Sequence, residues 1–122
     1  MNDEPLLMTM MFDFFGDLLT IKQREYFDLY HNEDLSLAEI AEKAGISRQG
    51  VYDIIARAEN SLKEMEKKTG VVQRWLNMQT ELQQAEMIAR QLLSLSEKEE
   101  KYAILTQELI HTLEDIKINS VR

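Results

Sequence analysis

The chain has 122 residues, 44% of them hydrophobic, which suffices for one small domain with an extension. It contains no cysteine, so its residues exclude a disulfide framework and a thiolate metal site. The net charge of −8, from 22 acidic and 14 basic residues, argues against strong non-specific affinity for nucleic acid.

The acidic charge is unevenly distributed. Residues 1–34 carry two basic and eight acidic side chains, residues 35–70 carry six of each, and residues 71–122 carry six and eight. Only the middle segment escapes the acidity, which weakly favours nucleic-acid contact there. There is no basic region followed by a long apolar run at the amino terminus and no apolar segment long enough to span a bilayer. We therefore expect a cytoplasmic protein without membrane insertion.

Residues 5–19 form the first predicted helix, with Pro5 in its first turn. Its apolar residues fall into two adjacent stripes: Leu7, Met11, Phe14 and Leu18 in one, and Met8, Phe12, Phe15 and Leu19 in the other. A helix that is apolar on two faces is expected to be buried on both, as a central core helix. The alternative is a methionine- and phenylalanine-rich groove that adapts to a partner.

The next helix is predicted to begin at a capping box formed by Thr20 and Gln23 and to run to about His31. Its inward-facing residues are expected to be Ile21, Tyr26 or Phe27, and Leu29 or Tyr30. Residues 32–35 form a short polar connection.

Residues 36–55 have the pattern of a helix-turn-helix. Ser36 and Glu39 make a second capping box, Gly45 ends the first helix, and Ser47 is the cap of the second. The apolar positions expected to meet inside are Leu37, Ile40, Ala41 and Ala44 on the first helix, Ile46 in the turn, and Val51, Ile54, Ile55 and Ala58 on the second. The alternative is an ordinary helical hairpin that binds nothing.

The second helix of this motif is predicted to continue to Gly70, which has the character of a C-cap. Lys67 and Lys68 lie in its last turn, where cations suit the helix dipole. A helix of this length exceeds what binding a groove requires. Its carboxy half is therefore expected to pack on the first helix or on a partner subunit.

Residues 71–122 are predicted to form a helical extension that is separate from the helix-turn-helix domain of residues 1–70. A heptad-like seam runs through Val71, Trp75, Met78, Leu82, Ala85, Ala89 and Leu92. A third capping box, Ser96 with Glu99, opens a last helix whose inside positions are expected to be Tyr102, Leu105, Leu109, Leu113 and Ile116. We expect a homodimer through Trp75, Met78, Leu82, Ala85, Ala89 and Leu92, with an intramolecular bundle as the alternative. The predicted fold class is all-α.

Catalysis is not indicated by any motif in the chain. The two histidines, His31 and His111, lie in different predicted helices without a carboxylate at ligand spacing. There is no glycine-rich phosphate loop and no activated-nucleophile motif. We therefore predict no enzyme activity, no cofactor and no metal site.

The candidate nucleic-acid contacts lie on the first turns of the second helix of the motif: Ser47, Arg48, Gln49, Tyr52, Asp53 and Arg57. A helix N-terminus can receive a phosphate beside Ser47, and Arg48 and Gln49 suit guanine and adenine in the major groove. Arg57 is expected to reach a phosphate, while Asp53 would repel phosphates or accept a hydrogen bond from cytosine. The alternative is that these are solvated helix residues.

Gly50 conflicts with its predicted place inside a helix, where glycine costs roughly 1 kcal/mol relative to alanine. We expect close approach of another backbone or of a ligand to explain it.

Residues 20–68 resemble region 4 of bacterial sigma factors, in the segments Thr-Ile-Lys-Gln-Arg-Glu-Tyr-Phe-Asp-Leu-Tyr, Ser-Leu-Ala-Glu-Ile-Ala and Gly-Ile-Ser-Arg-Gln-Gly-Val-Tyr-Asp. More closely, the whole chain resembles the YlxM family of small bacterial helix-turn-helix proteins. The phrase Ser-Arg-Gln-Gly-Val-Tyr-Asp at residues 47–53 is the most specific part. The carboxy-terminal third is similar in length and helical character more than in residues.

This resemblance implies an all-helical fold with a sigma-like helix-turn-helix, and a regulatory role without catalytic residues. It places Ser47, Arg48, Gln49 and Tyr52 on the DNA-reading positions of the sigma family. It also implies an association with the signal recognition particle pathway, which in the family is inferred from neighbouring genes for the particle's GTPase and its receptor.

Two functions follow as hypotheses. The first is a dimeric DNA-binding regulator with one recognition helix per half-site. The second is a protein-interaction or assembly factor of the signal recognition particle pathway that uses the helix-turn-helix as a scaffold. A variant of the second binds the particle's RNA, whose A-form major groove would not be readable by the helix.

Overall fold

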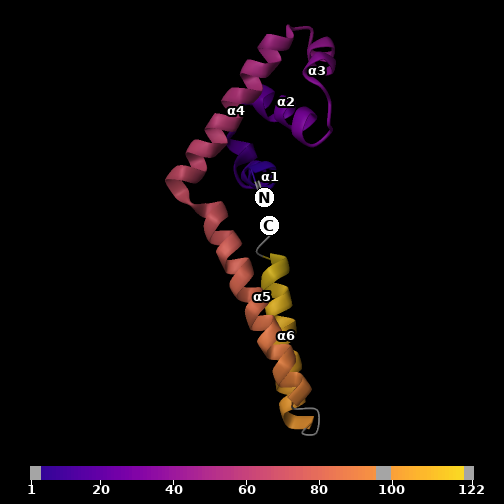
Figure 1. The fold of residues 1–122 in the computed structure, drawn as a ribbon, viewed down its shortest axis with the longest axis vertical. Helices are drawn as coiled ribbons and strands as arrows, with labels where there is room; N and C mark the ends of the chain where they lie inside the picture. The colour runs from indigo at the N-terminus through magenta and orange to yellow at the C-terminus, as the bar shows by residue number, and fades with distance from the viewer. Residues whose placement is uncertain (1–3, 96–99, 120–122) are drawn as a thin grey trace. The chain divides into compact units, whose positions relative to one another are not determined.

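The computed structural model describes residues 4–95 and 100–119, and this part of the chain is all-helical, without a strand (Figure 1). The elements are α1 (Glu4–Phe15), the 3-10 helix η1 (Gly16–Leu18), α2 (Ile21–His31), α3 (Leu37–Ala44), α4 (Arg48–Thr69), α5 (Val71–Leu95) and α6 (Glu100–Asn119). The predicted all-α fold class is confirmed.

The chain divides into two compact units, Met1–Val72 and Gln73–Arg122. The first unit contains α1 to α4, and the second contains almost all of α5 and the whole of α6. Among the described helices, none combines the length and the apolar character needed to cross a membrane.

Local capping chemistry sets the ends of the short helices. Thr20 Oγ1 accepts from the Gln23 amide at 3.2 Å, and Gln23 Oε1 accepts from the Thr20 amide at 3.1 Å. Ser36 and Glu39 make the same reciprocal pair at the start of α3. Both capping boxes were predicted, and both satisfy backbone groups that a helix end leaves unpaired. The capping box predicted at residues 96 and 99 lies outside the described residues.

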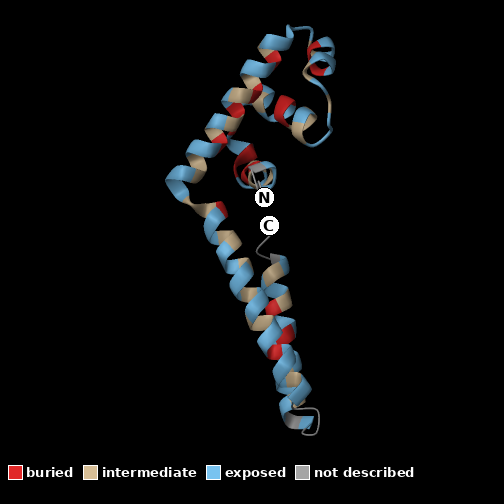
Figure 2. Cartoon of the chain, in the orientation of Figure 1, coloured by how far each residue is buried: buried red, intermediate tan, exposed pale blue. Residues whose placement is uncertain are grey.

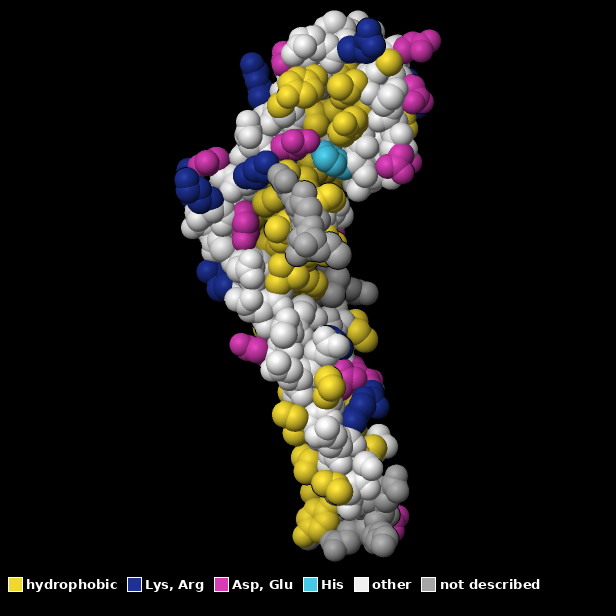
Figure 3. Space-filling view, viewed as in Figure 1, with side chains coloured by type: hydrophobic (Ala, Val, Ile, Leu, Met, Phe, Trp, Pro, Cys, Tyr) yellow, Lys and Arg dark blue, Asp and Glu magenta, His cyan; other side chains and the backbone are white. Residues whose placement is uncertain are grey.

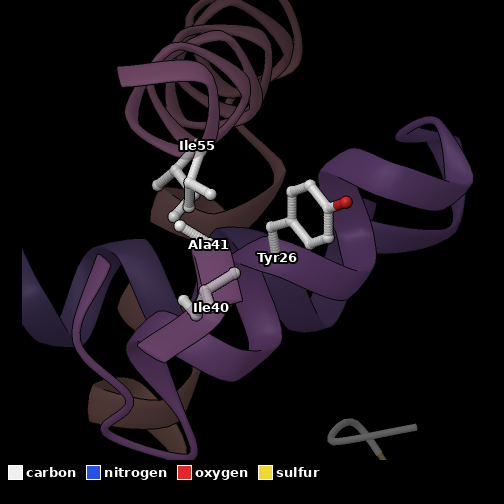
Figure 4. Packing of buried hydrophobic residues seen from close by; sticks show 5 residues of the cluster. Tyr26, Ile40, Ala41 and Ile55 are labelled. Carbon is white, nitrogen blue, oxygen red and sulfur yellow. The ribbon is translucent and has the colours of Figure 1, made fainter. Parts of the chain in front are cut away.

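The helix-turn-helix is held by a cluster of buried side chains from α2, α3 and α4 (Figure 4). Its members are Tyr26, Ile40, Ala41, Val51 and Ile55. The small Ala41 side chain faces Ile55 of α4 in Figure 4, as close packing of α3 on α4 requires. Predicted inward positions on α3 and α4 are therefore confirmed.

Two positions that were expected inside lie at the surface instead. Ile46, the predicted plug of the turn, is 39% exposed. Gly45 makes the turn alone in the left-handed conformation, with φ 70° and its amide donating to the Ala41 carbonyl at 2.9 Å. Ile21 is 84% exposed because it occupies the first position of α2, ahead of the turns that meet α4. Tyr26 and Phe27 are both buried.

The first helix ends four residues earlier than predicted and is covered mainly on one side. One predicted stripe supplies the buried Met8, Phe15 and, after η1, Leu19. Of the other stripe Met11 is buried, whereas Phe14 and Leu18 are exposed. Gly16, the first residue of η1, lies against the Phe12 ring. A Cβ at Gly16 would lie 3.2 Å from the ring of Phe12, which stacks on Phe27 at 4.5 Å between ring centroids.

The long α4 is the element against which the rest of its unit packs. Its buried residues Val51, Ile55, Ala58 and Leu62 follow each other at spacings of four and three, which keeps them on one face. Helices α1, α2 and α3 all contact α4, and Figure 2 shows the buried residues of this unit on the sides that meet it. The carboxy half of α4 thus packs within its own chain.

Helices α5 and α6 form an antiparallel hairpin with a thin core of Ala89, Ile110 and Leu113. Of the five inside positions predicted on α6, only Leu113 is buried, and Tyr102, Leu105, Leu109 and Ile116 are 41–56% exposed. The apolar sector of α6 is wider than a single neighbouring helix can cover. Helix α5 covers the side that contains Ile110, which leaves the predicted stripe open to solvent.

Candidate nucleic-acid interface

The candidate interface is the amino-terminal end of α4. Ser47 caps the helix, and its Oγ accepts from the Gly50 amide at 3.0 Å. The amides of Arg48 and Gln49 come before the first intrahelical hydrogen bond of α4, which runs from Val51 to the Ser47 carbonyl at 3.1 Å. These first-turn amides are the donors that a phosphate would meet, because a helix N-terminus carries partial positive charge.

The structure brings the predicted contact residues together on the solvent side of α4: Ser47, Arg48, Gln49, Tyr52, Asp53 and Arg57 are all exposed. Val51 and Ile55 anchor the opposite face of the same turns in the core. The exposed groups are therefore presented by a rigid helix rather than by a loop.

One hydrogen bond within this surface was not predicted. Gln49 Nε2 donates to Asp53 Oδ1 at 2.9 Å, one turn along the helix. The Asp53 carboxylate thus binds the Gln49 amide group that would donate to an adenine. Spacing i,i+4 on a helix allows this pair, so the sequence contained the signal.

The charges around the end of α4 are mixed rather than basic. Arg48 and Arg57 on α4 and Lys43 on α3 are exposed, but so are Glu39 and Glu42 on α3. Asp53 adds a third exposed carboxylate to this surface. The exposed side therefore lacks the uniform positive potential that drives non-specific binding to DNA.

Two adjoining hollows flank the exposed turns of α4. One, of about 320 Å³, is lined by Leu37, Arg48, Gln49 and Tyr52. The other, of about 230 Å³, is lined by Tyr30, Leu37, Tyr52, Ile55, Ala56 and Glu59. Figure 3 shows apolar side chains gathered over this unit with charged groups around them. The sequence predicted Leu37 in the core and either Leu29 or Tyr30 as an inward residue, so it did not predict that Leu37 and Tyr30 line this surface.

Gly50 leaves space that its neighbours in the turn use. A Cβ there would lie 3.2 Å from Ser47 Oγ and 3.5 Å from Ile46 Cδ1. Ser47 and Ile46 therefore occupy the space into which a side chain at residue 50 would extend. This contact explains Gly50 without a ligand, and the expectation that a ligand or another backbone approaches it stays a prediction.

His31 positions α2 against α4. Its Nε2 lies 2.8 Å from Glu59 Oε1, and its ring packs on Phe27 with 4.2 Å between ring centroids. The other histidine, His111, lies 3.8 Å from Asp115 on the same helix of the hairpin. Within residues 4–95 and 100–119, no cluster of three histidine, cysteine or acidic residues could hold a metal ion.

The predicted dimerisation residues fall in different environments within the hairpin unit. Ala89 is buried, and Leu82 and Ala85 pack against the same intramolecular cluster. Trp75 is half-buried, whereas Met78 and Leu92 are 40% and 48% exposed. Leu82, Ala85 and Ala89 therefore serve the contact between α5 and α6 of one chain, which is the intramolecular alternative. The homodimer itself stays a prediction.

Comparison with known proteins places the chain in a family. Residues 2–105 match the UPF0122 family, which is described as "Putative helix-turn-helix protein, YlxM / p13 like". Similar proteins include the UPF0122 protein of Thermoanaerobacter sp. (strain X514), which is 41% identical over 97% of this chain and 100% of the relative.

The match extends to other bacteria at comparable identity. The UPF0122 protein of Halalkalibacterium halodurans is 44% identical over 93% of this chain and 100% of its own length. The relative in Caldanaerobacter subterraneus is 49% identical over 68% of this chain and 71% of its own. These comparisons confirm the resemblance to the YlxM family, and the chain belongs to the UPF0122 family of YlxM- and p13-like helix-turn-helix proteins.

Proposed function

We propose that the chain is a regulatory protein that binds DNA through the first two turns of α4, in the cytoplasm and in association with the signal recognition particle pathway. The observation that carries the DNA-binding part is the joint exposure of Arg48, Gln49 and Tyr52 at the capped end of a rigid helix. The pathway association rests only on the family resemblance.

Each group at the end of α4 would have a distinct role on DNA. The first-turn amides would receive a phosphate, and Arg48 would donate two hydrogen bonds to a guanine. Gln49 would read an adenine only after releasing Asp53 from the bond at 2.9 Å. Arg57, about two turns further along α4, would contact a phosphate. No catalytic step is part of this role.

Asp53 would make recognition selective. A carboxylate that faces the phosphates weakens binding to any sequence, because like charges repel at short range. The same carboxylate can accept a hydrogen bond from the amino group of cytosine. A specific site would then be distinguished from random DNA by the hydrogen bond that Asp53 accepts from cytosine as well as by those that Arg48 donates to guanine.

The first experiment measures binding to fragmented genomic DNA at low and moderate salt. The variant Arg48→Ala/Gln49→Ala should lose selective retention, with affinity for the selected fragment falling about 5- to 100-fold. The matched control is Gln73→Ala/Arg74→Ala, which removes the same two residue types from exposed positions in the first turn of α5. Absence of retention at low salt, or equal loss in both variants, would refute DNA reading by α4.

Asp53→Asn tests the selectivity argument separately. Affinity for random DNA should rise and its salt dependence should steepen, because one repulsive charge is gone. Selectivity for the retained fragment should fall at the same time. Unchanged binding to both kinds of DNA would show that Asp53 does not face the nucleic acid.

The smaller hollow beside α4 favours a second candidate function. Its lining of Tyr30, Leu37, Tyr52 and Ile55, with the carboxylate of Glu59 at its edge, suits a side chain of a partner protein better than a base edge. On this account the chain is an assembly factor that binds the protein or the RNA of the signal recognition particle. Tyr30→Ala should then weaken binding to the purified particle, and Arg48→Ala/Gln49→Ala should leave it unchanged.

A further inference from the structure

The α5–α6 hairpin has two different sides. Six large apolar residues lie one position before residues that are buried or half-buried in the hairpin, and each is 41–58% exposed. They are Ile88 and Leu92 on α5 and Tyr102, Leu105, Leu109 and Ile116 on α6. We call these six residues the apolar flank.

Both halves of the apolar flank lie on the same side of the hairpin. One position on an α-helix is a rotation of 100°, so each set is turned by that angle from the face that meets the other helix. Because α5 and α6 run in opposite directions, equal rotations in the two helices point to the same side of the plane they share. The flank is therefore continuous across both helices, and Figure 3 shows apolar side chains reaching the surface along the hairpin.

The opposite side of the hairpin carries a network of ion pairs. Arg90, one position after the buried Ala89, bonds Glu114, one position after the buried Leu113, at 2.8 Å. Glu86 joins them by accepting from Arg90 at 3.0 Å and from Lys117 at 3.0 Å. Ion pairs of this kind suit a face that stays in water.

The core between α5 and α6 is too small to stabilise the hairpin by itself. Its buried residues are Ala89, Ile110 and Leu113, and alanine contributes little apolar area. Two helices that share so few buried side chains are expected to need further packing. The apolar flank is the surface that can provide it.

We propose that the apolar flank binds the same flank of a second copy of this chain, so that two hairpins form a four-helix bundle. Its six half-exposed side chains offer roughly 500 Å² of apolar surface. That matches the apolar share of a homodimer interface that buries about 800 Å² per partner. A second hairpin presents an apolar face of the same length under two-fold symmetry. The contact is independent of what α4 binds.

The test is the mass of the full chain in solution over a range of concentrations, by sedimentation equilibrium. The unaltered chain should be a dimer. Leu105→Lys/Leu109→Lys should raise the dissociation constant about 100-fold or more, because it places charges in the interface. The matched control Ile104→Lys/Ile118→Lys alters two residues of α6 that are 54% and 61% exposed but lie on the other side, and it should remain dimeric.

Cross-linking tests the same surface without disturbing the fold. The chain has no cysteine, so Leu109→Cys and Ile104→Cys each introduce a single thiol. A flexible bismaleimide should link two chains through position 109 and not through position 104. A monomeric unaltered chain, equal cross-linking at both positions, or a dimer that survives Leu105→Lys/Leu109→Lys with full helicity would each overturn the proposal. A monomer would mean that the flank is covered within its own chain or not at all.

Discussion

Gly45 should be the turn residue whose replacement is governed by backbone conformation alone. Its φ of 70° lies in the left-handed region, and a Cβ built there would meet nothing within 4 Å. Gly45→Ala therefore adds no steric contact and should cost only the left-handed penalty of an L-residue, about 1 kcal/mol of unfolding free energy. Gly45→Asn should cost less, because asparagine tolerates this conformation better.

The assay is thermal unfolding followed by circular dichroism, with tryptophan fluorescence as a second probe. A loss of 1 kcal/mol corresponds to a Tm lower by about 4–8 °C for a domain of this size. Trp75 is the chain's only tryptophan and lies in the hairpin unit, residues 73–122. If the two units unfold separately, the fluorescence transition should stay in place while the dichroism transition moves.

Two results would refute this reasoning about Gly45. Equal destabilisation by alanine and asparagine would show that a side chain of any kind is excluded, so that contact and not conformation limits the site. A loss above about 3 kcal/mol for alanine would exceed what one left-handed residue costs. Either outcome would mean that the turn is more crowded than its free space of 4 Å indicates.

Three further predictions follow from the packing and charges. Leu62→Ala should lower the unfolding free energy by about 3–5 kcal/mol in chemical denaturation, because it empties a fully buried site on α4. Gly16→Ala should destabilise by about 1–3 kcal/mol in the same assay, since its Cβ would press on the stacked Phe12 ring 3.2 Å away. Hydrogen bonds, first from Lys117 and then from Arg90, hold the pKa of Glu86 below its ordinary value. The hairpin should therefore keep this stabilisation above the ordinary carboxyl pKa and lose it as pH falls, and Glu86→Gln should flatten that part of an acid titration followed by helicity.

Local chemistry explains why the helix boundaries could be predicted. Ser36 with Glu39, Thr20 with Gln23, and the left-handed Gly45 act within one turn of the chain, so their effect does not depend on distant packing. The helix-turn-helix core could be predicted as well, because Ile40, Ala41 and Val51 lie at spacings that place them on the facing sides of the two helices. Arg48, Gln49 and Tyr52 could then be predicted as exposed, because they lie on the opposite side of the helix from that buried face.

Tertiary structure decided which part of each wide apolar sector is covered. Spacing marks Leu109 and Ile110 of α6 equally well as apolar, but α5 buries Ile110 and leaves Leu109 exposed. The same holds for α1, where Met11 is buried and Phe14 is not. Periodicity measures the width of an apolar sector, whereas burial depends on which neighbour occupies it. That choice is made by contacts between residues far apart in the chain, such as Ala89 with Ile110, and no local pattern contains it.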